Sequence, residues 1–489
     1  MRRSTRGPRS DRSAPAPLGP GGDKLREECG VFGIRTEGAG AAPFVHLGLY
    51  ALQHRGQESA GIATHDGART HLVKHMGLVA QVFTPERLAT LLGPTGIGHV
   101  RYSTMGSASL ENAQPFLEQS PWGVLALAHN GNLVNAPLIR QDLEAAGHCF
   151  RATSDTEVIT KLIATSRAET LEEAIAGCMR RISGAYTVVG MVGDVLVAFR
   201  DANGIRPLAL GRLGGAAVFA SESCAFDQIG GEYVREVGPG ELVVADAAGV
   251  RSIQVLPVAR RASCVFEYIY FARPDTVLEH QNVHQVRRRM GRLLAREYPV
   301  EADAVIAVPD SGTSAAMGYA DASGIPCEVG LIKNRYVGRT FIQPDQVSRD
   351  FGVRVKLNPI RDVIAGQRIV LVDDSIVRGT TSRQIVRMLR HTGAREVHVR
   401  ISSPPILNAC YYGIDTSSRG ELVASRLSVE EIRTSIEADS LGYLSLAGLV
   451  EALALPERAL CLACLNGRYP TETPTEAMAG RYALEARRT

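Results

Sequence analysis

Apolar runs alternate with helical patterns through the second half of this 489-residue chain. After Arg261 the sequence reads SCVFEYIYFARPDT, then AVIAVPDSGTSAAMGYA, and further on IVLVDDSIVRGTT followed by SRQIVRMLRHTG. A continuous apolar run is typical of a strand buried on both faces of a parallel sheet, and strands that alternate with helices favour an α/β architecture. We therefore predict an α/β domain with a mainly parallel sheet in this half.

A phosphate-binding loop is predicted where the third of these runs ends. The strand pattern stops at Asp373 and Asp374, and a loop of small residues leads into the next helical pattern. Such loops bind ligands in open α/β sheets, and main-chain N–H groups, here those of Gly379, Thr380 and Thr381, can hold a phosphate. The two carboxylates would repel phosphate, so we expect them to face hydroxyl groups or a cation. The pattern favours a sugar phosphate, and a plain strand-turn-helix with a solvated acidic turn is the alternative.

A second loop of the same kind follows the run AVIAVP. Asp310, Ser311 and Gly312 stand between this run and a helical pattern, and their main-chain N–H groups could surround an anion. Two phosphate cradles on neighbouring strands fit a molecule that carries phosphate at both ends.

Together the two loops resemble the substrate site of type I phosphoribosyltransferases, which bind phosphoribosyl pyrophosphate (PRPP). The resemblance implies that the paired acids contact the ribose and that a Mg²⁺ ion bridges the protein and the pyrophosphate. The Mg²⁺ ligands that it implies are Ser311, Asp373 and Asp374, and further substrate contacts are Lys333 and Arg378. The polar stretch 333–349 is similar to the loop that closes over PRPP in this family. A mobile surface loop is the alternative for this stretch.

Glycine-containing segments follow one another in the first half of the chain: EECGVFGI, QHRGQESAGIA, GHVRYST and LAHNGNLVN. Each alone predicts only a loop, apart from a short alternating strand after Cys29, and a single cysteine beside a strand is usually a small core residue. In their order and spacing, the segments resemble the N-terminal-nucleophile glutaminase domain of glutamine amidotransferases, over residues 29–258. The resemblance implies an α+β fold with stacked antiparallel sheets between helices.

Hydrolysis of a glutamine side chain requires a nucleophile, a base, an oxyanion site and a clamp for the amino-acid end. A cysteine with an exposed α-amino group carries its own base, because an amine with a pKa of about 8 can accept the thiol proton. The resemblance implies that Cys29 is this nucleophile and that Asn130 and Gly131 donate to the oxyanion. It also implies that Arg101 and Asp155 bind the α-carboxylate and the α-ammonium group of glutamine. A structural ion pair is the alternative for these two residues.

Residues 1–28 are expected to form a propeptide, because Cys29 has no basic amine until the peptide bond after Glu28 is cut. The segment is rich in Arg, Ser, Pro, Gly and Ala, and it lacks the long apolar run of a secretory signal. This composition is typical of disorder. An organellar transit peptide is the alternative, although two Asp residues and many Pro and Gly residues disfavour an amphipathic helix.

Over nearly all of the chain after residue 28, the sequence resembles the amidophosphoribosyltransferase family. That family makes 5-phosphoribosylamine, glutamate and pyrophosphate from glutamine, PRPP and water, which is the entry step of purine synthesis. The resemblance also implies feedback inhibition by purine nucleotides and a homotetramer or homodimer. The domains expected are the propeptide 1–28, a glutaminase domain 29–258, and a phosphoribosyltransferase domain 259–489 that ends in a helical and cysteine-bearing segment.

Four cysteines match the positions that carry a [4Fe-4S] cluster in one subgroup of this family, a subgroup that also has a propeptide. They are Cys264, Cys410, Cys461 and Cys464, the last two in a C-x-x-C motif. The motif alone is compatible with zinc, a redox pair or chance, so zinc and no metal are the alternatives. Nine cysteines are too sparse for a disulfide scaffold in so long a chain, which favours a reducing, cytoplasmic environment.

Two other functions are less consistent with the residues. Glucosamine-phosphate synthase and asparagine synthetase share the glutaminase domain, but neither binds PRPP, which the DDSIVRGTT loop predicts. A catalytically silent, PRPP-sensing regulator would not need the intact glutaminase residues. A net charge of +3 without a basic stripe disfavours a nucleic-acid partner. No apolar run approaches the roughly 20 residues of a membrane helix.

Overall fold

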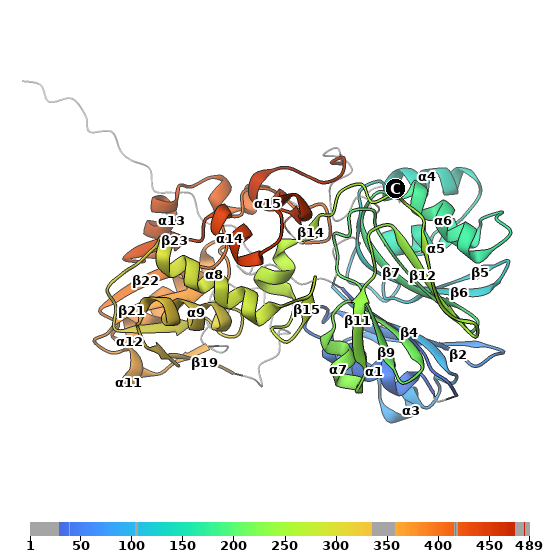
Figure 1. Ribbon diagram of the computed structural model, residues 1–489, viewed down its shortest axis with the longest axis horizontal. Coiled ribbons are helices and arrows are strands. Elements are labelled where there is room, and N and C mark those ends of the chain that lie inside the picture. Colours follow the sequence, from blue (N-terminus) through green and yellow to red (C-terminus); the bar gives the residue numbers. More distant parts are fainter. Residues whose placement is uncertain are drawn as a thin grey trace, which may run out of the picture.

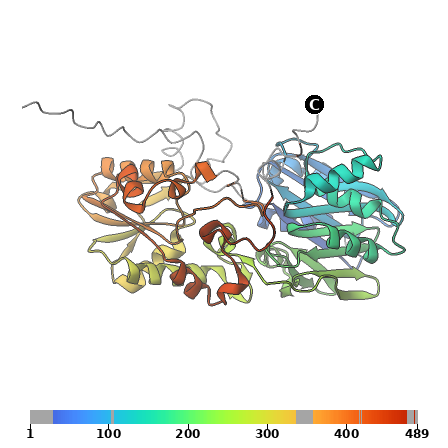
Figure 2. The ribbon, with the colours of Figure 1, turned by 90° about the horizontal axis from the view of Figure 1, so that it is seen from above.

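The computed structural model describes residues 29–38, 40–102, 106–334, 357–414, 416, 419–474 and 484. The predicted propeptide and most of the predicted closing loop 333–349 lie outside the described residues, whereas Lys333 lies within them. The described chain forms two lobes, one from each half of the sequence (Figure 1). The lobes also lie side by side when the molecule is turned by 90° (Figure 2). None of the helices described is long and apolar enough to cross a bilayer.

Two antiparallel sheets form the middle of the amino-terminal lobe. The strand order is β11-β9-β10-β1-β4-β2-β3 in the first sheet and β13-β12-β8-β7-β6-β5 in the second. The strands of the first are β1 Gly30–Arg35, β2 Ser59–His65, β3 Thr70–Met76, β4 Thr95–Arg101, β9 Ala209–Leu213, β10 Ala216–Ala220 and β11 Glu232–Glu236. Those of the second are β5 Phe116–Ser120, β6 Gly123–Leu133, β7 Gly184–Val192, β8 Val195–Arg200, β12 Glu241–Asp246 and β13 Gly249–Gln254.

Helices cover the outer face of each sheet, so this lobe has four layers. One apolar cluster joins the first sheet to α1 (Ala42–Ala51) and α7 (Cys224–Ile229), and another joins the second sheet to three helices. These helices are α4 Ala136–Ala145, α5 Asp155–Ala164 and α6 Leu171–Arg181. A third cluster lies between the two sheets. The predicted arrangement of stacked antiparallel sheets between helices is therefore confirmed.

The glycine-containing motifs lie largely in strands, so the prediction of loops was wrong for them. SAGIATH forms β2, GHVR ends β4 and HNGN lies in β6. The glycines are needed for close packing between layers. A Cβ at Gly33 would lie 2.5 Å from Val189 of the facing sheet, and one at Gly98 would lie 2.5 Å from Val45 of α1. The strand after Cys29 is buried along nearly its whole length instead of alternating, because both of its faces are covered.

A five-stranded parallel sheet in the order β18-β17-β21-β22-β23 forms the middle of the carboxyl-terminal lobe, as predicted. Its strands are β17 Ala304–Ala307, β18 Cys327–Glu328, β21 Arg368–Asp373, β22 Glu396–Ile401 and β23 Ser440–Tyr443. The cluster on one face includes α8 (Val283–Glu297), α9 (Thr313–Ser323) and α14 (Leu446–Leu453). The cluster on the other includes α12 (Thr380–Thr392) and α13 (Val429–Ile436). Successive side chains of β21 belong alternately to these clusters, which explains its continuous apolar run.

Short elements occupy the junction between the lobes. The two-residue strands β14 (Ser263–Cys264) and β24 (Leu460–Cys461) pair in parallel, and the π-helix η1 spans Glu267–Phe271. Val134, Ala185 and Ile205 of the amino-terminal lobe share an apolar cluster with these elements. The antiparallel pair β19 (Leu331–Lys333) and β20 (Leu357–Pro359) lies in the carboxyl-terminal lobe.

Candidate functional site

Cys29 stands directly before β1 in the interior of the amino-terminal lobe. Its side chain is buried, and its Sγ donates a hydrogen bond to the Tyr102 carbonyl oxygen at 3.3 Å. Burial raises the pKa of the thiol to about 11, an effect that the backbone contact with Tyr102 and the charge of nearby Arg101 only partly oppose. With its main-chain nitrogen in a peptide bond, Cys29 therefore holds a protonated and weakly nucleophilic thiol.

Arg101 and Asp155 flank the same region from different elements. Arg101 ends β4, is almost fully buried, and donates from Nη1 to the Ser107 carbonyl oxygen at 3.1 Å. Asp155 is the first residue of α5 and accepts a hydrogen bond from the Leu133 N–H at 3.0 Å. Burial raises the pKa of Asp155. The charge of His129 and several hydrogen bonds lower it by more, so the pKa of Asp155 lies below its ordinary value. Both residues can therefore remain charged in a buried site.

Asn130 and Gly131 lie near the end of β6, which pairs with β7. The Asn130 side chain is buried, and its Nδ2 has no hydrogen-bond acceptor among the described residues. A buried amide donor without an acceptor is costly, and a ligand oxygen at this place could accept its hydrogen bond. Gly131 has φ of +143°, and a Cβ there would lie 2.1 Å from the Ala185 carbonyl oxygen. Only glycine fits at that position.

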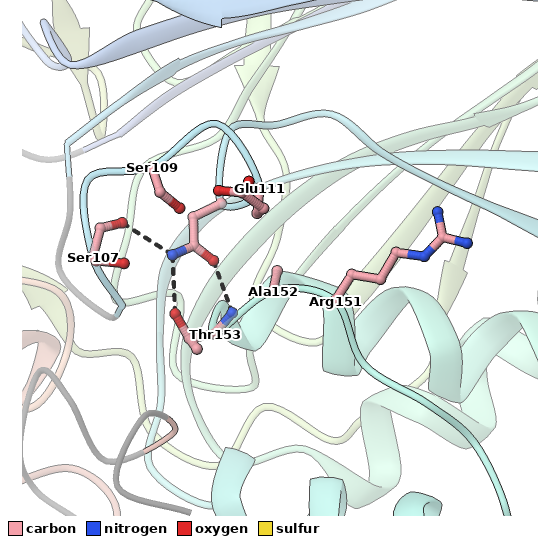
Figure 3. A pocket seen from close by; sticks show the side chains of 7 residues that line it. Ser107, Ser109, Glu111, Arg151, Ala152 and Thr153 are labelled. Atoms are coloured by element: carbon pink, nitrogen blue, oxygen red, sulfur yellow. Dashed lines mark hydrogen bonds between the residues drawn. The ribbon is translucent and has the colours of Figure 1, made fainter. Parts of the chain in front are cut away.

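A hollow of about 350 Å³ lies in the amino-terminal lobe. Its lining consists of Ser107, Ser109, Glu111, Asn112, Arg151, Ala152 and Thr153. Asn112 Nδ2 donates to the Ser107 carbonyl oxygen at 3.0 Å and to Thr153 Oγ1 at 2.9 Å, while Asn112 Oδ1 accepts from the Thr153 N–H at 2.8 Å (Figure 3). Because Ser107 also contacts Arg101, the hollow lies against the predicted amino-acid clamp.

The two predicted phosphate loops adjoin at the carboxyl edge of the parallel sheet. The Val308 N–H donates to the Val372 carbonyl oxygen at 2.9 Å, so the loop after β17 lies against the end of β21. A Cβ at Gly312 would lie 2.4 Å from that same carbonyl oxygen, which explains the glycine. Gly379 has φ of +82° and precedes α12, whose first turn contains Thr380 and Thr381. The sequence thus placed both loops correctly at one edge.

The acidic pair is buried, although it lies at the edge of the sheet. Asp373 and Asp374 are 4% and 1% exposed, and Asp374 accepts a hydrogen bond from the Ser375 hydroxyl at 2.5 Å. Burial lowers the pKa of Arg287, in α8, to about 10. The negative charge of nearby Asp374 opposes this shift and favours the protonated guanidinium of Arg287. Two buried carboxylates beside a hydroxyl group form an oxygen-rich ligand set of the kind that Mg²⁺ binds.

The remaining residues of this edge differ in exposure. Asp310 is exposed, and Lys333 Nζ lies 2.5 Å from its Oδ2. Ser311 is half-buried. Arg378 forms an ion pair with Glu421. Lys333 and Arg378, the two side chains predicted to bind phosphate, are therefore each paired with a carboxylate in the described structure.

The four predicted cluster cysteines gather at the junction of the lobes. Cys264 and Cys461 are register partners in the β14–β24 pair. Burial is the main cause that raises the pKa of Cys464, and the charges of Cys264, Cys410 and Cys461 raise it further. Three of the four are buried and Cys410 is half-buried. Among the described residues, no three cysteine, histidine or carboxylate side chains already stand in a metal-ligand arrangement. The four cysteines therefore lie in one region of the junction, within electrostatic range of Cys464.

Sequence reasoning missed three residues that the structure brings into the amino-terminal site. Asn112 ties two sides of the hollow together, and His129 Nδ1 lies 3.7 Å from Asp155 Oδ1. Arg55 donates from Nε to the carbonyl oxygen of Cys29 at 3.1 Å. Arg55 and His129 were visible in the QHRG and HNGN motifs, whereas no motif contained Asn112.

Known proteins match this chain along most of its length. The glutamine amidotransferase domain family matches residues 99–228. The chain is 52% identical over 454 residues to an amidophosphoribosyltransferase of Bacillus subtilis, covering 92% of this chain and 95% of that protein. It is 48% identical to one of Methanocaldococcus jannaschii, covering 93% and 100%. The structure of glutamine PRPP amidotransferase from B. subtilis, complexed with ADP and GMP, has a TM-score of 0.86 at 51% identity and covers 91% of this chain and 98% of that chain.

Alkylation of Cys29 in the uncut chain should be slow at neutral pH and should become faster up to about pH 11, because burial raises the thiol pKa and only the thiolate reacts. The rate can be measured with iodoacetamide by mass spectrometry of the labelled peptide, with exposed Cys149 as an internal reference for the reagent. A plateau at the ordinary thiol pKa of about 8.5 would contradict this expectation.

Proposed function

The chain belongs to the amidophosphoribosyltransferase family, and from this premise we propose how its residues divide the reaction between the two lobes. The enzyme uses glutamine, PRPP and water to give 5-phosphoribosylamine, glutamate and pyrophosphate, the first step of de novo purine synthesis. One observation carries the division. A buried cysteine within electrostatic range of Arg101 and Asp155 stands in one lobe, and a buried acidic pair at the edge of a parallel sheet stands in the other.

In the amino-terminal lobe, Cys29 attacks the side-chain amide of glutamine. The amide donor of Asn130 and the N–H of Gly131 stabilise the tetrahedral oxyanion, a contribution that is typically about 3 to 4 kcal/mol for one donor. Arg101 and Asp155 hold the α-carboxylate and the α-ammonium group. The buried Asn130 donor, which has no acceptor among the residues that the structure describes, supports the oxyanion role, and the depressed pKa of Asp155 supports binding of a cation.

In the carboxyl-terminal lobe, the loops 310–312 and 378–381 bind the two phosphate ends of PRPP. Ser311, Asp373 and Asp374 would hold Mg²⁺ directly or through water, since this ion keeps part of its hydration shell. When bound, Mg²⁺ supplies positive charge to the pyrophosphate as the bond to the anomeric carbon breaks. The adjacent burial of both carboxylates, and the contact between the loop that carries Ser311 and the end of β21, support this ligand set.

Residues 1–28 form a propeptide in this proposal, and its removal makes Cys29 the amino terminus. The raised thiol pKa supports it, because a buried thiol with a pKa of about 11 needs a neighbouring base to react at neutral pH. The new α-amino group provides that base on the same residue. We place the boundary between the two catalytic domains at residues 258 and 259, in the segment that links β13 to β14.

The four gathered cysteines bind a [4Fe-4S] cluster in this proposal. Their thiols lie within electrostatic range of one another in a mostly buried, apolar setting, where uncompensated thiolates are unfavourable and a bound iron cluster would compensate their charge. Once bound, the cluster would tie together three separate segments of the chain, around residues 264, 410 and 461–464. Zinc at the same thiolates remains the competing assignment.

Purine nucleotides are the proposed regulatory ligands, since the B. subtilis relative was solved with ADP and GMP bound. We further propose a homotetramer or homodimer in the cytoplasm. The sparse cysteines, several of them in a potential metal site, support a reducing compartment.

Cys29→Ala should abolish the glutamine-dependent formation of phosphoribosylamine but leave formation from high concentrations of ammonia within about twofold of the wild type, because only the amide-hydrolysing step needs the thiol. Glutamate release and pyrophosphate release, measured with each nitrogen source, separate the two activities. Loss of both activities in a folded variant would show that the two sites are not separable.

Mass spectrometry of the active protein should show a chain that begins at Cys29, because an acylated nitrogen cannot act as the base. Glu28→Pro, which should obstruct the cut, provides the matched uncut protein. Full glutamine-dependent activity of a chain that retains residues 1–28 would contradict the propeptide.

Protein purified without oxygen should contain iron and acid-labile sulfide at about four of each per chain. Cys464→Ser should lose most of both, whereas Cys149→Ser should retain them, because Cys149 is exposed and separate from the four. Zinc without sulfide would instead support the competing assignment.

A further inference from the structure

One arginine connects the nucleophile to the opposite lobe. Arg55 is completely buried, and its Nε donates to the carbonyl oxygen of Cys29 at 3.1 Å. The other side of the same guanidinium faces Glu267, with Nη1 2.9 Å from Oε2 and Nη2 2.7 Å from Oε1. Glu267 is the first residue of the π-helix η1, which belongs to the carboxyl-terminal half. A bidentate arginine thus lies between the main chain of Cys29 and a carboxylate of the transferase lobe.

A second carboxylate, Glu222, connects the lobes at the same place. Arg55 Nη1 donates to its Oε1 at 2.6 Å. Its Oε2 accepts from the Thr276 hydroxyl at 2.7 Å and from the Arg273 N–H at 2.9 Å, both in the carboxyl-terminal half. The charge of His54, followed by that of Arg55, overcomes burial and holds the pKa of Glu222 well below its ordinary value. The carboxylates that surround Arg55 are therefore fixed by residues of both lobes.

The π-helix itself is held firmly in place. Arg287 of α8 donates from Nε to the Tyr268 carbonyl oxygen at 2.6 Å and from Nη2 to the Ala272 carbonyl oxygen at 2.8 Å. Arg206 of the amino-terminal lobe lies on the other side, with Nη1 3.6 Å from Glu267 Oε1. The carboxylate of Glu267 consequently has little freedom to move without the carboxyl-terminal lobe.

We propose that Glu267 is a positioning residue for the glutaminase reaction, which it supports from the other lobe by orienting Arg55 against the carbonyl group of Cys29. The inference rests on the proposed role of Cys29 as the nucleophile. Two parallel hydrogen bonds fix the plane of a guanidinium, and that plane fixes the direction of the third donor, Nε. The main chain of Cys29, and with it the thiol and the α-amine, then takes the position that the attack on glutamine requires.

Glu267→Gln tests this role, because glutamine has nearly the same shape but donates toward Arg55 with one of its two terminal atoms. We expect kcat for glutamine hydrolysis to fall about 10- to 100-fold, the range for a misplacement of about 1 Å. KM for glutamine should change less than about threefold, since Arg101 and Asp155 are untouched. Ammonia-dependent synthesis should stay within about twofold of the wild type. Alkylation of Cys29 by a diazo-ketone analogue of glutamine should slow in parallel with kcat.

Arg55→Lys is the second variant, because lysine keeps the charge but cannot bind a carboxylate and a carbonyl oxygen with fixed geometry. The double variant should be no worse than the more impaired single variant, because the two residues act as one unit. Glu241→Gln is the matched control. Its carboxylate is also buried and bidentate with an arginine, Arg235, at 2.8 and 2.7 Å, but no hydrogen bond or ion pair among the described residues joins that pair to Cys29.

The outcomes separate this inference from the proposed function. If the wild type lacks PRPP-dependent glutaminase activity, the proposed function fails first. If the wild type is active and Glu267→Gln equals Glu241→Gln in both activities, Glu267 has no positioning role. An equal loss of glutamine- and ammonia-dependent activity in both Glu267→Gln and Arg55→Lys would show a general structural role and would likewise overturn the proposal. Thermal unfolding of each variant confirms that the compared proteins are folded.

Discussion

A buried guanidinium must be surrounded by carboxylates or carbonyl oxygens, and at Arg55 these acceptors come from both lobes. Arg55, Arg206, Glu222 and Glu267 have side chains that are at most 3% exposed. Replacement of buried ion pairs by apolar residues is often neutral or stabilising by about 1 to 4 kcal/mol, so stability alone does not account for such a group. What it supplies is a defined geometry between the lobes, which a purely apolar junction would fix less strictly.

The two reactive regions are built by different architectural means. In the amino-terminal lobe, the proposed site residues come from the ends of strands in two stacked antiparallel sheets and from the first turn of α5, so burial between the layers influences their charge states. In the carboxyl-terminal lobe, the proposed site residues come from two loops that adjoin at one edge of a parallel sheet, the edge at which open α/β sheets bind ligands.

The fold class and the place of the two predicted loops at one sheet edge could be predicted from the sequence, because they depend on local patterns. The apolar run of β21 ending in Asp373 and Asp374 indicated a buried strand and its functional edge. Other features depend on contacts between distant residues. Arg55 and Glu267 are 212 residues apart, so no local pattern pairs them. The strand that contains Asn130 was mistaken for a loop because its glycines serve close packing between layers, a requirement that appears only once the layers are assembled.

The segment that contains Cys410 contacts β6, the strand that contains Asn130 and Gly131, so it lies between the proposed cluster and the proposed oxyanion site. Asn132 Nδ2 of β6 donates to the Tyr411 carbonyl oxygen at 2.9 Å, and a Cβ at Gly413 would lie 3.3 Å from the Gly131 carbonyl group. Arg206 binds the Tyr412 carbonyl oxygen through Nε at 2.8 Å. A shift of this segment would therefore press directly on β6, the strand that contains the proposed oxyanion donors Asn130 and Gly131. For this reason, a group that fixes Cys410 would also limit the movement of the proposed glutaminase site. One short stretch of backbone, residues 410–413, would then both hold the cluster and support β6.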